Sequence, residues 1–163
     1  MYKIEKKPVL ILGIGNYLMG DEGLGVHLAR DLENSDLPEG IDVIDGGTGG
    51  FHLLELFEQY HHVILADATL NSWNVSEIRR IRPKFASDFP KAMSTHDIGL
   101  KDLVSALQLL GKMPDVHLFV VNIETIQQQG IELTPEISAV MPELRRLVLE
   151  LAVEFLGVAE EVL

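Results

Sequence analysis

Short, continuously apolar runs alternate along this chain with longer segments in which apolar residues recur every three or four positions. The first run, Val9–Gly13, contains no polar side chain and ends at a glycine. Such runs are typical of strands that are buried on both faces of a parallel sheet. Because strands that alternate with helical segments favour βαβ units, the pattern predicts an α/β fold.

The pattern places strands and helices in a regular order along the chain. Strands are expected at residues 9–13, 41–45, 62–67, 75–81 and 116–121, the fourth of them at a sheet edge. Helices are expected at about 23–33, across 53–60, after the capping pattern at 94–97 and after Thr134–Pro135. The predicted architecture is a three-layer α/β/α sandwich with a mostly parallel twisted sheet of about five strands. No repeat, low-complexity tract or linker interrupts it, so we expect a single domain spanning residues 1–163.

Composition restricts the chemistry and the partners. The chain has no cysteine, which excludes disulfides, thiolate metal ligands and a cysteine nucleophile. Its formal net charge of −12, from 13 Lys+Arg and 25 Asp+Glu, is unfavourable for binding nucleic acid or an anionic lipid surface. No apolar run reaches the roughly 18 residues of a membrane span, and the N-terminus lacks the apolar core of a signal peptide. We therefore expect a cytoplasmic protein with no membrane span and no nucleic-acid partner.

The most distinctive polar residues follow the predicted strands. Glu22 lies in the glycine-rich loop after the first strand, Asp67 closes the third strand, and His96 stands just before a predicted helix. In sheets of this type, ligands bind at the carboxyl ends of the strands, where these three side chains can converge. Two carboxylates and one imidazole suit nickel, zinc, manganese or iron(II). Each residue also has an ordinary structural interpretation. Glu22 can complement the helix dipole, Asp67 can cap a turn, and His96 can be a surface histidine.

A second glycine-rich segment, Asp45–Gly50, follows the second predicted strand. Four of its six residues are glycines, so its backbone either turns tightly or lets another chain approach closely. Its two interpretations are a flexible turn and a floor for an extended peptide. In the second, Asp45 faces the same edge of the sheet as Glu22 and Asp67.

The glycine-rich loop at residues 13–25 also raises the alternative of a Rossmann-type nucleotide-binding enzyme. The G-x-G-x-x-G spacing fails, however, because Leu18 stands where the third glycine belongs. Asp21 and Glu22 would also place negative charge beside a pyrophosphate. The peptidase and hydrolase signatures G-x-S-x-G and H-E-x-x-H are absent from the sequence.

The remaining histidines are expected to be structural. We expect no cluster of acidic or histidine neighbours that would nominate His27, His52 or His117 as metal ligands. His61 and His62 are adjacent in a predicted strand, so their side chains point to opposite faces and do not easily bind one ion together.

Four ordered segments together resemble the hydrogenase maturation endopeptidase family. They are residues 13–25 (GIGNYLMGDEGLG), 45–48 (DGGT), 66–68 (ADA) and 94–100 (STHDIGL). The resemblance spans nearly the whole chain. It implies an endopeptidase that removes the C-terminal extension of a nickel–iron hydrogenase large-subunit precursor after nickel has been inserted. It further implies that Glu22, Asp67 and His96 bind this nickel, which belongs to the substrate, and that Asp45 is an acidic position associated with activity.

The implied activity is that of a metal-dependent, aspartyl-type endopeptidase, and two mechanisms stay open. In one, the metal polarises the scissile carbonyl or activates a water molecule. In the other, Asp45, Glu22 or Asp67 acts as a general base. A non-catalytic nickel-binding maturation chaperone, which would use the same three metal ligands to hold the precursor, is the main alternative function.

Overall fold

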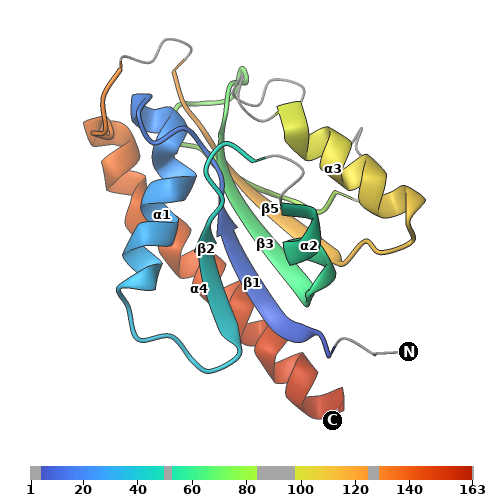
Figure 1. Ribbon diagram of the computed structural model, residues 1–163. Coiled ribbons are helices and arrows are strands. Elements are labelled where there is room, and N and C mark those ends of the chain that lie inside the picture. Colours follow the sequence, from blue (N-terminus) through green and yellow to red (C-terminus); the bar gives the residue numbers. More distant parts are fainter. Residues whose placement is uncertain (1–4, 50–52, 84–97, 125–128, 163) are drawn as a thin grey trace.

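Five strands form one sheet in the computed structural model (Figure 1). The structure describes residues 5–49, 53–83, 98–124 and 129–162. The strands are β1 (Lys7–Gly13), β2 (Ile41–Asp45), β3 (Tyr60–Thr69), β4 (Ile78–Ile81) and β5 (Asp115–Asn122). Their spatial order is β2-β1-β3-β5-β4, and every neighbouring pair is parallel except β4 with β5. The predicted mostly parallel sheet is therefore confirmed, and so is the edge strand expected at residues 75–81, although β4 begins only at Ile78.

Helical segments alternate with these strands. They are η1 (Gly20–Gly23, a 3₁₀ turn), α1 (Leu24–Glu33), α2 (Leu54–Glu58), α3 (Ile98–Leu109) and α4 (Pro135–Val162). The helix expected across residues 53–60 is limited to the five residues of α2, because β3 already begins at Tyr60. No helix within the described ranges is long and apolar enough to cross a lipid bilayer.

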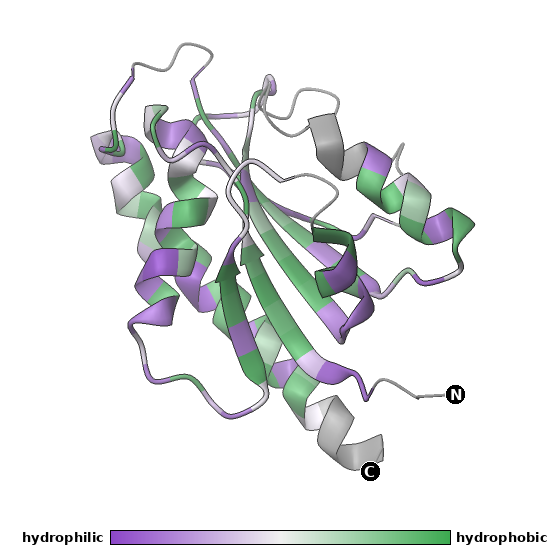
Figure 2. Cartoon of the chain, in the orientation of Figure 1, coloured by the Kyte–Doolittle hydropathy of each residue, from purple (hydrophilic) through white to green (hydrophobic). Residues whose placement is uncertain are grey.

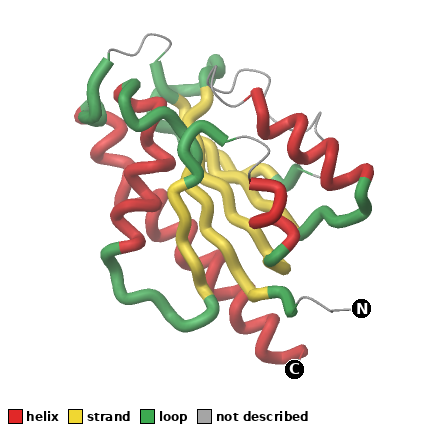
Figure 3. The backbone as a smooth tube through the Cα atoms, in the orientation of Figure 1, coloured by secondary structure: helices red, strands yellow, loops and turns green. Residues whose placement is uncertain are grey.

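The helices cover both faces of the sheet, which confirms the three-layer architecture (Figure 3). Val9 and Ile11 of β1 pack with α1 and α4, whereas Leu10 and Leu12 pack with α2 and α3. This alternation follows from the two-residue period of side chains along a strand. Figure 2 shows the strands as predominantly hydrophobic, as expected for strands covered on both faces.

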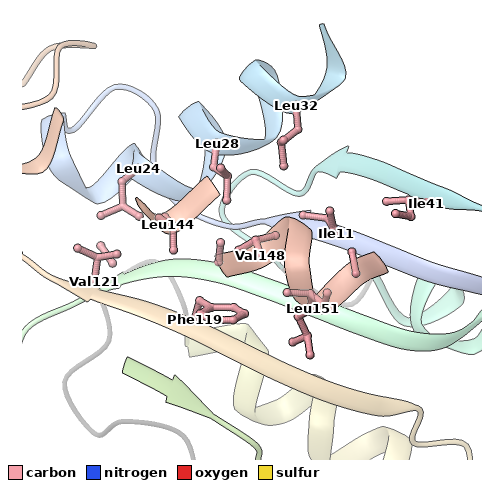
Figure 4. Close-up of a cluster of buried hydrophobic side chains, with 14 of the residues drawn as sticks. Ile11, Leu24, Leu28, Leu32, Ile41, Phe119, Val121, Leu144, Val148 and Leu151 are labelled. Atoms are coloured by element: carbon pink, nitrogen blue, oxygen red, sulfur yellow. The ribbon is translucent and has the colours of Figure 1, made fainter. Parts of the chain in front are cut away.

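The core beneath α1 fixes that helix on the sheet (Figure 4). One face of α1 contributes three fully or almost fully buried leucines, Leu24, Leu28 and Leu32. They belong to the same cluster as Leu144 and Val148 of α4. Each buried leucine contributes roughly 1.5–3 kcal/mol of hydrophobic stabilisation. The N-terminal end of α1, and the loop that leads into it, are thereby held at the carboxyl edge of the sheet.

Candidate active site

Glycines allow the first turn of α1 to lie directly against β1 and β3. A Cβ atom on Gly25 would lie 2.2 Å from the carbonyl oxygen of Ala66 and 2.3 Å from that of Ile14. A Cβ atom on Gly13 would lie 2.0 Å from the carbonyl oxygen of Gly25. Because interiors are close-packed, separations this short leave no room for a side chain. The glycines of segment 13–25 therefore serve a backbone-to-backbone contact that sets where α1 begins.

Glu22 is held in η1, the short turn between β1 and α1. Its N–H donates to the carbonyl oxygen of Met19 at 3.1 Å, and its own carbonyl oxygen accepts from the N–H of Asn16 at 3.2 Å. A Cβ atom on Gly15, whose φ is +152°, would lie 2.2 Å from that same Glu22 carbonyl oxygen. Glu22 is only 8% exposed. Local hydrogen bonds and glycine packing thus fix a nearly buried carboxylate residue beside the sheet.

Asp67 lies inside β3 rather than at its end. The strand continues to Thr69, because Ala68 and Thr69 still pair with β5, and this corrects the predicted strand end. Asp67 is fully buried, and its Oδ1 accepts a hydrogen bond from the N–H of Ala68 at 2.7 Å. By strand alternation it lies on the same face as Leu65, the face that α2 and α3 cover.

The elements that carry Glu22 and Asp67 touch each other. η1 contacts β3, and the N–H of Ile14 donates to the carbonyl oxygen of Ala66, the residue before Asp67, at 2.9 Å. The third predicted ligand, His96, lies outside the described residues. Among the residues that are described, no group of three or more His, Asp or Glu side chains is arranged to hold a metal ion. The three-ligand metal site therefore stays a prediction.

Asp45 ends β2 and pairs with Gly13, the last residue of β1, so it shares the carboxyl edge of the sheet with Asp67. Its carboxylate, however, contacts α1. Oδ2 lies 3.4 Å from Nε of Arg30, and Oδ1 accepts from the N–H of Gly47 at 2.9 Å. Asp45 and Asp67 thus lie at one edge but on opposite faces of the sheet.

The glycine-rich segment after Asp45 is bonded to the loop after β1. The N–H of Gly46 donates to the carbonyl oxygen of Gly13 at 2.8 Å, and the N–H of Gly15 donates to that of Gly47 at 2.7 Å. Gly47 has φ +56°, a left-handed conformation that favours glycine. Gly13, Ile14, Gly15 and Gly46 are buried, so these hydrogen bonds join two loops inside the molecule. A Cβ atom on Gly47 or Gly49 would meet nothing within 4 Å, so the backbone is open at these two positions. The peptide floor stays a prediction.

Arg30 contacts both Asp45 and Tyr17, and the sequence analysis did not predict these contacts. Its guanidinium lies 3.8 Å from the ring centroid of Tyr17, in addition to its ion pair with Asp45. The ring of Tyr17 is in turn 5.0 Å from that of His27. Half of the Arg30 side chain is exposed (50%), so a cation and an aromatic ring face solvent beside the loop that carries Glu22.

A second polar cluster lies at the amino ends of β3 and β5, the opposite edge of the sheet. Oδ2 of Asp115 lies 2.9 Å from Nδ1 of His62 and 3.0 Å from Nε2 of His117. The guanidinium of Arg80 lies 2.9 Å from Nδ1 of His117. Because arginine can only donate, Nδ1 of His117 accepts and its Nε2–H donates to Asp115. His117 is therefore neutral in this arrangement.

The pKa values of this cluster follow its contacts. Burial lowers the pKa of His117; Asp115 opposes that shift, whereas the charges of Arg80 and Arg82 add to it. Burial alone would raise the pKa of Asp115, but hydrogen bonds from both histidines and Arg82 bring it below its ordinary value. His117 does have an acidic partner, Asp115, which it shares with His62; its structural role stays a prediction. Asp115 and His117 are two residues apart in β5 and therefore share a face, whereas the strand register was needed to place His62 opposite Asp115.

Comparisons with known proteins support the predicted fold and family. A family model described as hydrogenase maturation protease (HycI) matches residues 26–151, a range that includes Asp45, Asp67 and His96 and begins after Glu22. The hydrogenase 2 maturation protease of Escherichia coli (strain K12) is 34% identical over 136 residues, which cover 82% of this chain and 83% of that protein. The hydrogenase expression/formation protein HupD of Bradyrhizobium diazoefficiens is 32% identical over 136 residues, covering 79% and 69%.

Solved structures match over nearly the whole chain. The hydrogenase maturating endopeptidase HybD from E. coli has a TM-score of 0.80 at 33% identity, with 90% of this chain and 92% of that chain covered. The HybD hydrogenase maturation protease from Thermococcus kodakarensis has a TM-score of 0.73 at 26% identity, covering 88% and 98%. The family model, the relatives and these structures each cover most of the sequence. The chain therefore belongs to the hydrogenase maturation protease family.

Proposed function

We propose that this chain is an endopeptidase that removes the C-terminal extension of a nickel–iron hydrogenase large-subunit precursor after nickel insertion. In this proposal it recognises the substrate's nickel through Glu22, Asp67 and His96. The observation that carries the proposal is the contact between η1 and β3. This contact brings two largely buried carboxylate residues, far apart in sequence, to one edge of the sheet.

Nickel is part of the substrate here, and the ligand set suits it. Carboxylate and imidazole groups are ligands that nickel accepts, and a chain without cysteine offers no competing thiolate. Burial increases the attraction of Glu22 and Asp67 for a cation. Two opposite unit charges about 4 Å apart attract by about 1 kcal/mol in water but by about 4 kcal/mol at the effective dielectric constant of a protein surface. Nearly buried carboxylates thus distinguish a nickel-loaded precursor from an empty one better than exposed ones.

Such recognition makes cleavage conditional on nickel insertion. A nickel ion that is incompletely coordinated in the precursor can accept ligands from this chain only once it is present. His96 is the imidazole donor of the proposal, and in sequence it precedes by two residues the start of α3, a helix on the face that Asp67 occupies. Binding therefore reports that insertion is complete.

The same edge of the sheet offers groups for the cleavage step. Gly47 and Gly49 follow Asp45 and have open space where a side chain would begin, so an extended peptide can approach the backbone there. Asp45, Glu22 and Asp67 remain the candidates for a general base that activates water. Bound nickel would supply Lewis-acid chemistry at the scissile carbonyl instead. In both versions, the role of this chain is to hold the extension next to the carboxylates.

The test is a cleavage assay with matched nickel-loaded and nickel-free precursors, read by mass spectrometry of the precursor's C-terminus. We expect the nickel-loaded precursor to lose the mass of its extension and the nickel-free precursor to keep it. Equal cleavage of both, or cleavage of neither, would refute nickel-gated proteolysis. Nickel-dependent binding without any change in mass would instead support the non-catalytic chaperone.

A further inference from the structure

Asp21, the acidic residue next to Glu22, contacts the start of α4. Its Oδ1 accepts a hydrogen bond from the N–H of Thr134, and its Oδ2 accepts one from the Thr134 hydroxyl, both at 2.8 Å. Thr134 immediately precedes Pro135, the first residue of this 28-residue helix. The N-terminus of a helix carries partial positive charge, which favours a carboxylate there. Asp21 is 2% exposed, so this contact is shielded from water.

The backbone supports the same contact. The N–H of Gly20 donates to the carbonyl oxygen of Gly130, and the N–H of Gly130 donates to that of Leu18, both at 2.8 Å. Together with the two bonds of Asp21, these bonds attach residues 18–21 to residues 130–134. Glu22 follows this attachment directly and donates its N–H to Met19. The turn that carries Glu22 is therefore held on one side by the glycine contacts with β1 and β3, and on the other by the segment that leads into α4.

We propose that Asp21 is a positioning residue, which holds Glu22 in its recognition geometry by binding Thr134. A turn as short as the four-residue η1 has few internal hydrogen bonds, so its shape depends on such tertiary contacts. Two adjacent acids thus have different tasks. Asp21 joins two segments that are far apart in sequence, and Glu22 meets the substrate's nickel. The inference rests on the proposed function for the role of Glu22, but not for the contact itself.

The experiment compares four variants of the full-length chain with the unchanged protein. Asp21→Asn replaces one of the two acceptor oxygens by an NH2 donor and removes the charge. Thr134→Val removes the hydroxyl donor, and Thr134→Ser restores that donor without the methyl group. Asp31→Asn is the matched control, because Asp31 also joins the α1 region to α4, through Arg145 at 3.0 Å, but away from η1. Its side chain is 61% exposed.

Two quantities are measured. The first is deuterium uptake by residues 17–24 in the free chain. The second is the ratio of the dissociation constants for nickel-free and nickel-loaded precursor. We expect Asp21→Asn to raise uptake in this segment and to lower the ratio by about 10- to 100-fold, as losses of groups that orient a metal ligand do. Thr134→Val should act in the same direction to a smaller extent, while Thr134→Ser and Asp31→Asn should resemble the unchanged chain.

The outcomes separate this inference from the proposed function. If the unchanged chain does not discriminate between the two precursors, the proposed function fails and the positioning role falls with it. If it discriminates and both Asp21→Asn and Thr134→Val keep the ratio, only the positioning role is overturned. Equal weakening of binding to both precursors would show a merely structural role and would also overturn it. If Asp21→Asn does not fold, Thr134→Val and its serine rescue decide the question alone.

Discussion

Replacing Gly25 by alanine tests whether the first turn of α1 contacts the sheet as closely as the structure shows. The new Cβ atom would lie 2.2 Å from the carbonyl oxygen of Ala66 and 2.3 Å from that of Ile14. Ordinary contact needs about 3.5 Å, so α1 would have to withdraw by about 1 Å. Withdrawal also disturbs the hydrogen bond from the Ile14 N–H to Ala66, now 2.9 Å long.

Two opposing effects set the size of the change. Alanine is a better helix former than glycine by about 1 kcal/mol, which alone would stabilise the protein. Overpacking a close-packed contact costs about 1–3 kcal/mol, and contact with two rigid backbone carbonyls places this case near 3. The free energy of unfolding should therefore fall by about 2 kcal/mol. For a domain of this size, that corresponds to a melting temperature about 4–8 °C lower.

Calorimetry and guanidinium unfolding would measure this change, with Gly157→Ala as the matched control. Gly157 is exposed in α4, and a Cβ atom there would have no neighbour within 4 Å. That variant should be neutral or more stable by up to about 1 kcal/mol. If Gly25→Ala is as stable as Gly157→Ala, the backbone contact that positions Glu22 does not exist in solution and the reasoning is wrong.

Three further predictions concern the site, the core and the second polar cluster. Glu22→Gln keeps the size of the side chain but removes its charge. Because loss of a group that only orients a metal ligand already costs about 10- to 100-fold, cleavage of the nickel-loaded precursor should fall by at least that factor. Glu33→Gln on the exposed surface of α1 should leave cleavage unchanged, and equal rates for the two variants would remove Glu22 from the site. Phe57→Ala leaves a cavity at a fully buried position, so a denaturant titration should show a free energy of unfolding lower by about 3–5 kcal/mol. A loss below about 1 kcal/mol would mean that α2 does not pack against the sheet as described. The pKa of His117 lies below its ordinary value of 6.5, so the unfolded chain binds more protons than the folded one just below that pH. Stability should therefore fall as the pH decreases from 6.5 through the lowered pKa, and the melting temperature measured against pH would show this. His117→Gln should flatten the slope, and an unchanged slope would contradict the assignment of this pH dependence to His117.

The fold was largely predictable because its signals are local. The apolar run at Val9–Gly13 and the helical period that follows it determine a buried strand and an amphipathic helix, whatever the rest of the chain does. Strand positions were correct, and so were both ends of β2, but the C-terminal end of β3 was not. β3 extends beyond Asp67 because pairing with β5 continues to Asn122, and such pairing depends on residues far away in sequence.

The four motif segments indicated the family, because a family's site residues occur as particular residue types in a fixed order along the chain. The same segments pointed to Glu22, Asp45, Asp67 and His96. The sequence could not determine which carboxylates share a face. Asp45 contacts Arg30 on the α1 side, and strand alternation places Asp67 on the other side, so the two acids at one edge have different neighbours.

The loop at residues 13–25 shows the division between sequence and tertiary structure most clearly. Its glycines and its two adjacent acids are visible in the sequence by themselves, and they already indicate a close backbone contact and a charged turn. Only the tertiary structure decided that Asp21 binds Thr134 at the start of α4 while Glu22 lies beside β3. The physical reason is that a side chain's partner is set by packing of distant segments, and two neighbouring carboxylates look alike until those segments meet.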